Sequence, residues 1–186
     1  SFNPQNLIKY KRGNIVKVHL GYNIGSEQGG LHYGIVLDNN NHKDSKVITI
    51  VPLRSLKENE KPEDIDKRFE LYLGKALLVD KIDYVEGEIK KIEERIKNIT
   101  SESTEHKMYI GRKIKFEKEL NNLNKGSVAI ISQIRTISKM RIYEPLKSYH
   151  SLSTFVLDNN KLKEIDTMIK NLFIGEDKSV DKKQNV

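Results

Sequence analysis

The chain has 186 residues, which fits one elaborated domain or two small ones. Its 33 basic residues outnumber its 26 acidic ones, and the formal net charge of +7 favours an anionic partner, although a solvated lysine-rich surface accounts for it equally well. The absence of cysteine excludes disulfides and thiolate metal sites, and no apolar run is long enough to span a bilayer, so we expect a cytoplasmic protein without membrane contact.

Three strand-like segments occupy the first third of the chain. Apolar residues alternate loosely with polar ones from Gly13, and compact apolar runs follow in residues 31–37 and 46–53. Pro52 lacks an amide hydrogen, so we expect it at a strand end or on a sheet edge. Short loops between these segments predict a small, curled antiparallel sheet or barrel.

The middle of the chain changes to a helical pattern. Residues 56–69 are polar and predict a loop, while residues 70–79 are apolar and fit either strand or helix. A one-sided apolar stripe then recurs at spacings of three and four, formed by Ile82, Val85, Ile89, Ile92, Ile96 and Ile99. Residues 100–104 offer N-cap candidates for a second helix that ends near Asn124. Together these features predict a helical hairpin over roughly residues 75–124.

A strand pattern returns at Gly126, and an amphipathic helix closes the chain. That helix carries Leu162, Ile165, Ile169 and Leu172, and we expect Gly175 to stop it and residues 175–186 to form a frayed, disordered tail. The five histidines are scattered and show no paired ligand spacing, so we predict no metal site and no cofactor.

Several residues could carry chemistry. The glycines of "GSEQGG" (25–30) can expose backbone amides to an anion, and Ser26, Glu27 and Gln28 can read a base edge or hold a neighbouring loop, but an ordinary hairpin loop explains them as well. His32 can act as an acid or base, or be a surface residue. Arg54 can clamp a phosphate, or be a solvated strand end.

A second group lies near the fourth strand. Arg135, Lys139 and Arg141 form a possible basic stripe, and Tyr22, Tyr33 and Tyr143 could stack bases beside it, although tyrosines in sheets are commonly packing residues.

Four motifs together resemble the PemK/MazF/Kid family of toxin endoribonucleases. They are "KRGNIVKVHLG" (11–21), "GSEQGG" (25–30), "IVPLRS" (50–55) and "SQIRTISKMRI" (132–142). The resemblance covers residues 11–55 and 126–174. It implies an α+β, mainly β fold: an SH3-like small barrel with a C-terminal helix, here with an inserted helical hairpin. It also implies a homodimer that cleaves single-stranded RNA without metal and is blocked by a small acidic antitoxin protein.

The chain departs from the family at the positions where its catalytic residues are expected. Many members have Gly-Gly-x-Arg-Pro and Pro-Leu-Thr-Ser, where this chain has Gly29-Gly30-Leu31-His32-Tyr33 and Pro52-Leu53-Arg54-Ser55. Ser132 replaces an acidic residue before Gln-Ile-Arg, and Asn14 stands where many members have Asp. One hypothesis is an exchanged catalytic set, in which His32 takes over the acid/base work and Arg54 stabilises the phosphate, with Ser55 beside it.

The other hypotheses give the same fold a binding role. The site could be degenerate, leaving an RNA- or protein-binding module, or the barrel could bind gyrase as some relatives of this fold do. In the ribonuclease interpretation we expect RNA to contact Ser26, Glu27, Gln28, Gly29, Gly30, Gln133 and Arg135.

The expected organisation is an N-terminal arm (1–10) and one barrel domain (11–174) interrupted by the insert at about 56–125. The hairpin has no family role to transfer. It is either a packing element that covers a sheet edge or extends a dimer interface, or a functional arm that docks an antitoxin or selects RNA.

Overall fold

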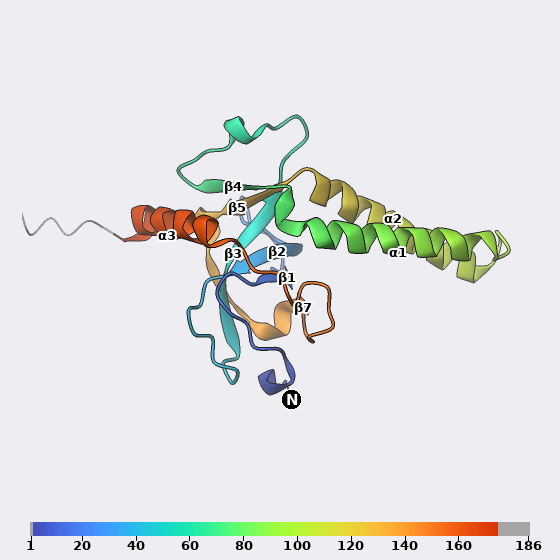
Figure 1. Cartoon of the computed structure of the whole chain (residues 1–186), viewed down its shortest axis with the longest axis horizontal. Helices are drawn as coiled ribbons and strands as arrows, with labels where there is room; N and C mark the ends of the chain where they lie inside the picture. The colour runs from blue at the N-terminus through green and yellow to red at the C-terminus, as the bar shows by residue number, and fades with distance from the viewer. Residues whose placement is uncertain (1, 175–186) are drawn as a thin grey trace, which may run out of the picture.

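The computed structural model describes residues 2–174, which form one curled antiparallel sheet with three α-helices around it (Figure 1). The strand order is β4-β5-β3-β2-β1-β7, and β6 pairs with β3 off this path. The strands are β1 (Ile15–His19), β2 (Leu31–Val36), β3 (Val47–Ser55), β4 (Glu70–Gly74), β5 (Ser127–Ile130), β6 (Arg135–Ser138) and β7 (Ile142–Glu144). The helices are α1 (Val79–Lys97), α2 (Thr104–Asn124) and α3 (Asn159–Phe173).

The long strand β3 gives the sheet its curl. On one edge it pairs with β2, and on the other it pairs first with β6 through Val47–Ile50 and then with β5 through Leu53–Ser55. One strand thereby pairs with three others within a single sheet, which lets the sheet curl into a small barrel. Pro52 therefore lies inside β3 rather than at its end, in the gap between the β6 and β5 pairings, where the missing amide hydrogen is tolerated. The predicted α+β, mainly β barrel with an insert and a C-terminal helix is confirmed.

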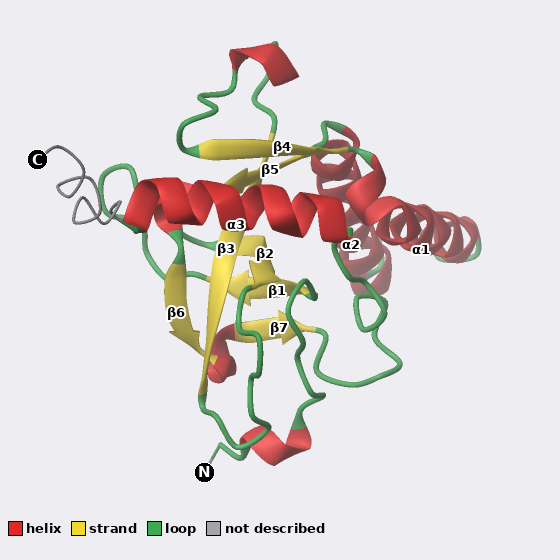
Figure 2. Cartoon of the chain, turned by 60° about the vertical axis from the view of Figure 1, so that its left-hand side comes forward, coloured by secondary structure: helices red, strands yellow, loops and turns green. Residues whose placement is uncertain are grey.

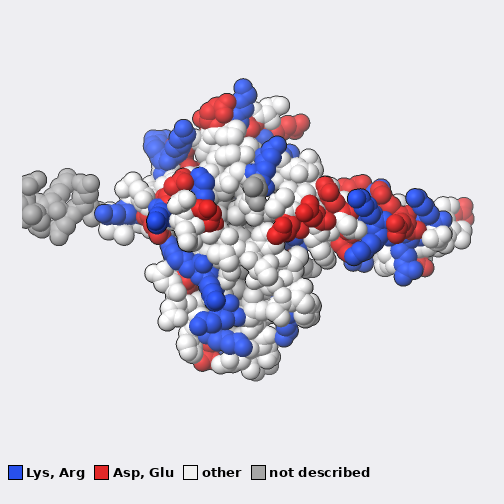
Figure 3. Space-filling view, viewed as in Figure 1, with Lys and Arg blue, Asp and Glu red and all other residues white. Residues whose placement is uncertain are grey.

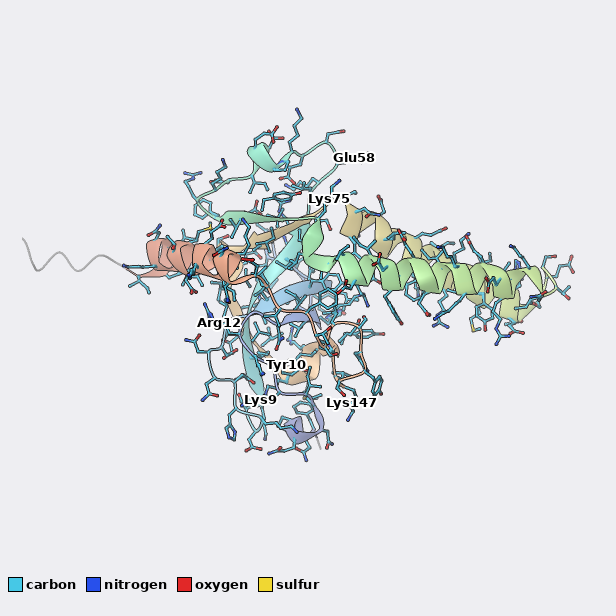
Figure 4. The ribbon with its side chains drawn as sticks, in the orientation of Figure 1. Lys9, Tyr10, Arg12, Glu58, Lys75 and Lys147 are labelled. Carbon is cyan, nitrogen blue, oxygen red and sulfur yellow. The ribbon has the colours of Figure 1, made fainter. Side chains whose placement is uncertain are left out.

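Two apolar clusters cover the two faces of the sheet, which explains why its strands show no clean alternation. One contains Ile15, Ile35 and Val51 with residues of α3 and the hairpin. The other contains Val16, Val18 and Tyr10. Tyr10 is 1% exposed and donates to the carbonyl of Pro145 at 2.7 Å, so the predicted N-terminal arm packs under the barrel (Figure 4).

The predicted hairpin is confirmed and leaves the barrel between β4 and β5. Residues 70–74, which the sequence left open, are strand, and α1 begins after a short turn. Ser103 caps α2 by accepting from the amide of His106. Leu78, Val85 and Leu123 at the root join the main core, and the remainder projects from the barrel (Figures 1 and 2).

The C-terminal helix α3 lies across the sheet (Figure 2). It buries Leu162 and Ile165, and Asp158 caps it by accepting from the amides of Asn160 and Lys161. The predicted stop at Gly175 and the tail at 175–186 lie outside the described residues. No helix within residues 2–174 has the length and apolar character that a bilayer crossing needs.

Candidate active site

A cleft of about 1180 Å³ lies where the sheet meets the root of the hairpin. Its walls come from β1, β2, the end of β3, both hairpin helices, and β7 with the loop that follows it. His32, Arg54 and Ser55 all line it, so the three residues predicted to be catalytic share one cavity. This arrangement follows from the pairing of β2 with β3, which places the two motifs that carry these residues side by side.

His32 is oriented by the backbone of β3. Its Nδ1 lies 3.0 Å from the carbonyl oxygen of Leu53. A carbonyl oxygen can only accept, so Nδ1 carries a hydrogen, and in the neutral ring Nε2 presents its lone pair. Nε2 has no hydrogen-bond partner within residues 2–174. The ring is therefore held in the tautomer that a general base needs.

The guanidinium of Arg54 is occupied by two carboxylates. Nε and Nη2 donate to Glu70 at 2.8 and 2.6 Å, Nη1 and Nη2 donate to Glu60 at 2.6 and 2.8 Å, and Nη1 also donates to the carbonyl of Ser55 at 3.1 Å. All five N–H donors of an arginine are thus in use. This geometry argues against our prediction that Arg54 clamps a phosphate, because the group has neither a spare donor nor an uncompensated charge.

Glu60 and Glu70 form a carboxylate clamp around Arg54, and the polar loop between β3 and β4 supplies one of these two residues. Glu60 belongs to that loop, and Glu70 begins β4, so both residues lie outside the motif that carries Arg54. Figure 4 shows Glu58, a neighbour of Glu60 in the sequence, on the same side of the molecule as Lys75 at the start of the hairpin. The loop that the sequence predicted to be merely polar therefore has a defined structural contact.

We expect the clamp to weaken in acid. Hydrogen bonds from Arg54 lower the pKa of Glu60 to about 2, from an unfolded value near 4.5. Because the folded pKa is depressed, this contribution to stability is present in full above pH 4.5 and is lost as the pH falls toward 2. Replacing Glu60 by Gln should flatten the fall in the urea unfolding midpoint between these pH values. An unchanged profile would show that the clamp does not contribute to stability.

Ser55 lies at the end of β3 opposite Ser127. Its carbonyl accepts from Arg54, while its hydroxyl has no hydrogen-bond partner within the described part of the chain. The hydroxyl is consequently available to a ligand in the cleft.

The "GSEQGG" loop is held by the "QIR" motif. Gln133 accepts from the amide of Gln28 at 2.7 Å and donates to the carbonyl of Ser26 at 3.0 Å, and Arg135 donates to the carbonyl of Gln28 at 3.2 Å. Gly29 fits here because a Cβ would lie 2.4 Å from the backbone nitrogen of Asn23. None of the seven residues expected to contact RNA lines the cleft. Gln133 and Arg135 brace the loop, and RNA contact by all seven residues stays a prediction.

The predicted basic stripe does not form, because Lys139 is buried and Arg135 is half-buried. Lys139 is 2% exposed and donates to the carbonyl of His42, and burial lowers its pKa. Arg135 is half-buried against the loop, which leaves Arg141 as the exposed member. The stripe was predicted on a single strand, but β6 ends at Ser138 and a short 3-10 helix follows at Lys139–Arg141.

Two partly buried ion networks join the hairpin to the barrel, and the sequence did not reveal either. Glu119 of α2 accepts from the ammonium of Lys17 at 2.6 Å and from the hydroxyl of Tyr33 at 2.5 Å. Burial and Glu119 together raise the pKa of Tyr33, whose hydroxyl is engaged by this carboxylate. In the second network Lys81 of α1 meets Glu144 of β7.

The sequence profile of a family described as "PemK-like, MazF-like toxin of type II toxin-antitoxin system" matches residues 11–106, slightly more than half of the chain. Among solved structures, the crystal structure of MazF (Form-I) from Deinococcus radiodurans is similar, with 12% identity over 89% of this chain and 96% of that chain and a TM-score of 0.45. No curated protein matches the chain.

Proposed function

We propose that this chain, which belongs to the PemK-like, MazF-like toxin family of type II toxin–antitoxin systems, is an endoribonuclease toxin that cleaves single-stranded RNA without a metal. The observation that carries the proposal is His32: it lines the cleft with Nδ1 bonded to a backbone carbonyl and Nε2 unbonded within residues 2–174. His32 stands where many family members have a catalytic arginine, so the proposal includes an exchanged catalytic group.

The chemistry needs only the RNA and side chains of the cleft. Nε2 of His32 takes the proton of a ribose 2′-hydroxyl, the 2′-oxygen bonds to the adjacent phosphorus, and the bond from phosphorus to the 5′-oxygen breaks. The leaving 5′-oxygen takes a proton from solvent, which gives a 2′,3′-cyclic phosphate and a 5′-hydroxyl end. All N–H donors of Arg54 are bonded to carboxylates or to the backbone. Other cations in the cleft and the Ser55 hydroxyl therefore stabilise the negative charge of the phosphorane.

Membership of this family also suggests two protein partners, an antitoxin and a second copy of the chain. We propose a small acidic antitoxin as the inhibitor, because a cleft whose charged side chains are mainly basic fits an acidic segment, and a homodimer as the active form. A gel-filtration mass and co-expression with the protein encoded by the adjacent reading frame test these two expectations separately.

The decisive experiment is cleavage of a long single-stranded RNA in the presence of EDTA. We expect cleavage of RNA, none of the all-deoxy counterpart, and 2′,3′-cyclic phosphate ends by mass spectrometry. Cleavage of the deoxy strand would rule out attack by the 2′-hydroxyl. Intact RNA that is nevertheless bound would identify a degenerate binding module, and gyrase binding without RNA binding would identify the gyrase alternative.

A further inference from the structure

The hairpin insert forms one wall of the cleft that holds His32. On α2, residues that line the cleft recur at helical spacings: Arg112, Lys115, Phe116, Lys118, Glu119 and Asn122. Side chains three or four apart on an α-helix lie on the same face, so a continuous face of α2 borders the site. The insert is consequently part of the cavity and not only an external packing element.

The cations of the cleft differ in how their charge is compensated. Lys17, Lys81 and Arg54 are each paired with a carboxylate at 2.6–2.9 Å. Arg112 lies 3.9 Å from Glu88. Lys57, in the loop after β3, and Lys115 and Lys118 on α2 are exposed and form no ion pair within residues 2–174. The uncompensated charge thus belongs to the insert and its neighbouring loop.

Many other charges of the hairpin are compensated, and Figure 3 shows basic and acidic side chains interspersed along it. Pairs such as Lys113 with Glu93 and Lys91 with Glu88 compensate charge along the two helices. A solvated helix surface with mixed charge needs no ligand, whereas unpaired lysines that border a cleft favour an anion there.

Exposed aromatic rings accompany these lysines. Tyr143 and Tyr149 line the same cleft and are 69% and 83% exposed. Nucleobases stack on exposed aromatic rings while lysines contact the phosphates. An acidic peptide would use the lysines but has no comparable use for two exposed rings. The combination therefore favours single-stranded nucleic acid over a protein segment.

We propose that α2 of the hairpin binds the phosphodiester backbone of the RNA substrate through Lys115 and Lys118, next to the catalytic cleft, with Tyr143 and Tyr149 as stacking surfaces. The inference rests on the proposed function for the identity of its ligand. It assigns the insert a role in substrate binding that the barrel motifs do not supply.

The test measures binding separately from cleavage. The full-length chain is titrated onto a labelled single-stranded RNA of about twelve nucleotides with 2′-O-methyl riboses, since one nucleic-acid-binding module covers roughly 4–16 nucleotides. The methyl groups remove the 2′-hydroxyl nucleophile, so affinity is measured without turnover. Fluorescence anisotropy between 50 and 200 mM salt, a range of about fourfold, gives the affinity and its salt dependence.

The variant Lys115→Gln/Lys118→Gln should bind this RNA roughly twentyfold more weakly at about 0.1 M salt, with a log–log salt slope shallower by about 1.4, because each phosphate contact on a single strand contributes about 0.7. The matched control is Lys90→Gln/Lys107→Gln. It removes the same charge from exposed hairpin positions outside the cleft and should stay within about twofold of wild type.

Three outcomes decide the matter. Unchanged affinity and salt slope in the Lys115/Lys118 variant would overturn the inference, even if the wild type cleaves RNA. A selective loss by this variant supports it, even if the wild type cleaves nothing and the nuclease proposal fails. A loss of affinity for a polyglutamate peptide with RNA binding intact would make the surface a protein-docking site and would also overturn it.

Discussion

Replacing His32 by Ala is expected to slow RNA cleavage by about 10²–10⁴-fold, the usual contribution of a positioned general base. Binding of the 2′-O-methyl RNA should change by less than about threefold, because the imidazole acts on the reacting proton and not on the phosphate charge. The comparison uses single-turnover rates with enzyme in excess, so product release does not limit the result. His42→Ala is the matched control, since His42 is exposed and does not line the cleft.

A structural role for His32 would produce the same loss of rate, so a second measurement is needed. The ring bonds to the carbonyl of Leu53, and its removal could disturb β3. If His32 is the base, imidazole added to the buffer should restore part of the activity of His32→Ala but not that of a misfolded chain. Full activity in His32→Ala, or the absence of rescue together with a lowered unfolding midpoint, would contradict the catalytic assignment.

The largest effect on stability is expected at Lys81. Its ammonium is buried at the root of α1 and donates to Glu144 at 2.9 and 3.2 Å and to Ser151 at 3.0 Å. The two charged side chains are 5% and 15% exposed. Lys81→Ala leaves Glu144 buried without its cation and should lower the free energy of unfolding by about 3–5 kcal/mol in urea titrations.

The pH dependence tests the same pair. Burial alone would raise the pKa of Glu144, but hydrogen bonds from Ser151 and Lys81 outweigh it and hold the pKa below its ordinary value of 4.5. The wild type should therefore be fully stabilised by this group above pH 4.5 and lose that stabilisation as the pH falls through the lowered pKa. In Lys81→Ala the pKa should rise and this acid-dependent loss should shrink.

Controls separate charge from packing. Lys91→Ala removes an exposed partner of Glu88 and should leave the urea unfolding midpoint almost unchanged. The variant Lys81→Met/Glu144→Gln removes both charges and should recover part of the stability lost in Lys81→Ala. If Lys81→Ala unfolds like wild type at neutral pH, the pair does not hold the hairpin to the barrel.

Local patterns predicted the elements well because each pattern reflects burial on one side of its own segment. The spacing from Ile82 to Ile99 gave α1, and the polar residues at 100–104 gave the cap at Ser103. Residues 70–74 could not be assigned from the sequence, since a short apolar run fits a buried strand or a helix. These residues form β4, whose partner strand β5 begins more than fifty residues further along the chain, so no local pattern shows the pairing.

The site was predicted only in part, because it depends on contacts between distant residues. His32, Arg54 and Ser55 line one cavity because β2 and β3 are neighbours, while their catalytic roles stay a prediction. The motifs did not reveal that Glu60 and Glu70 would surround Arg54, because scattered glutamates in a polar loop show no period. Likewise, the contact of Glu119 with Lys17 joins residues 102 positions apart.

The insert joins two paired strands, so the length of its helices is independent of the geometry of the cleft at its root. Gly74 pairs with Ser127, so the two helices leave and re-enter the barrel side by side, between strands that stay paired whatever lies between them. Each full turn added to both helices lengthens the projection by about 5.4 Å. The arm can therefore lengthen or shorten at its tip without displacing the cleft at its root, and related chains with arms of different length should keep the same arrangement around this cleft.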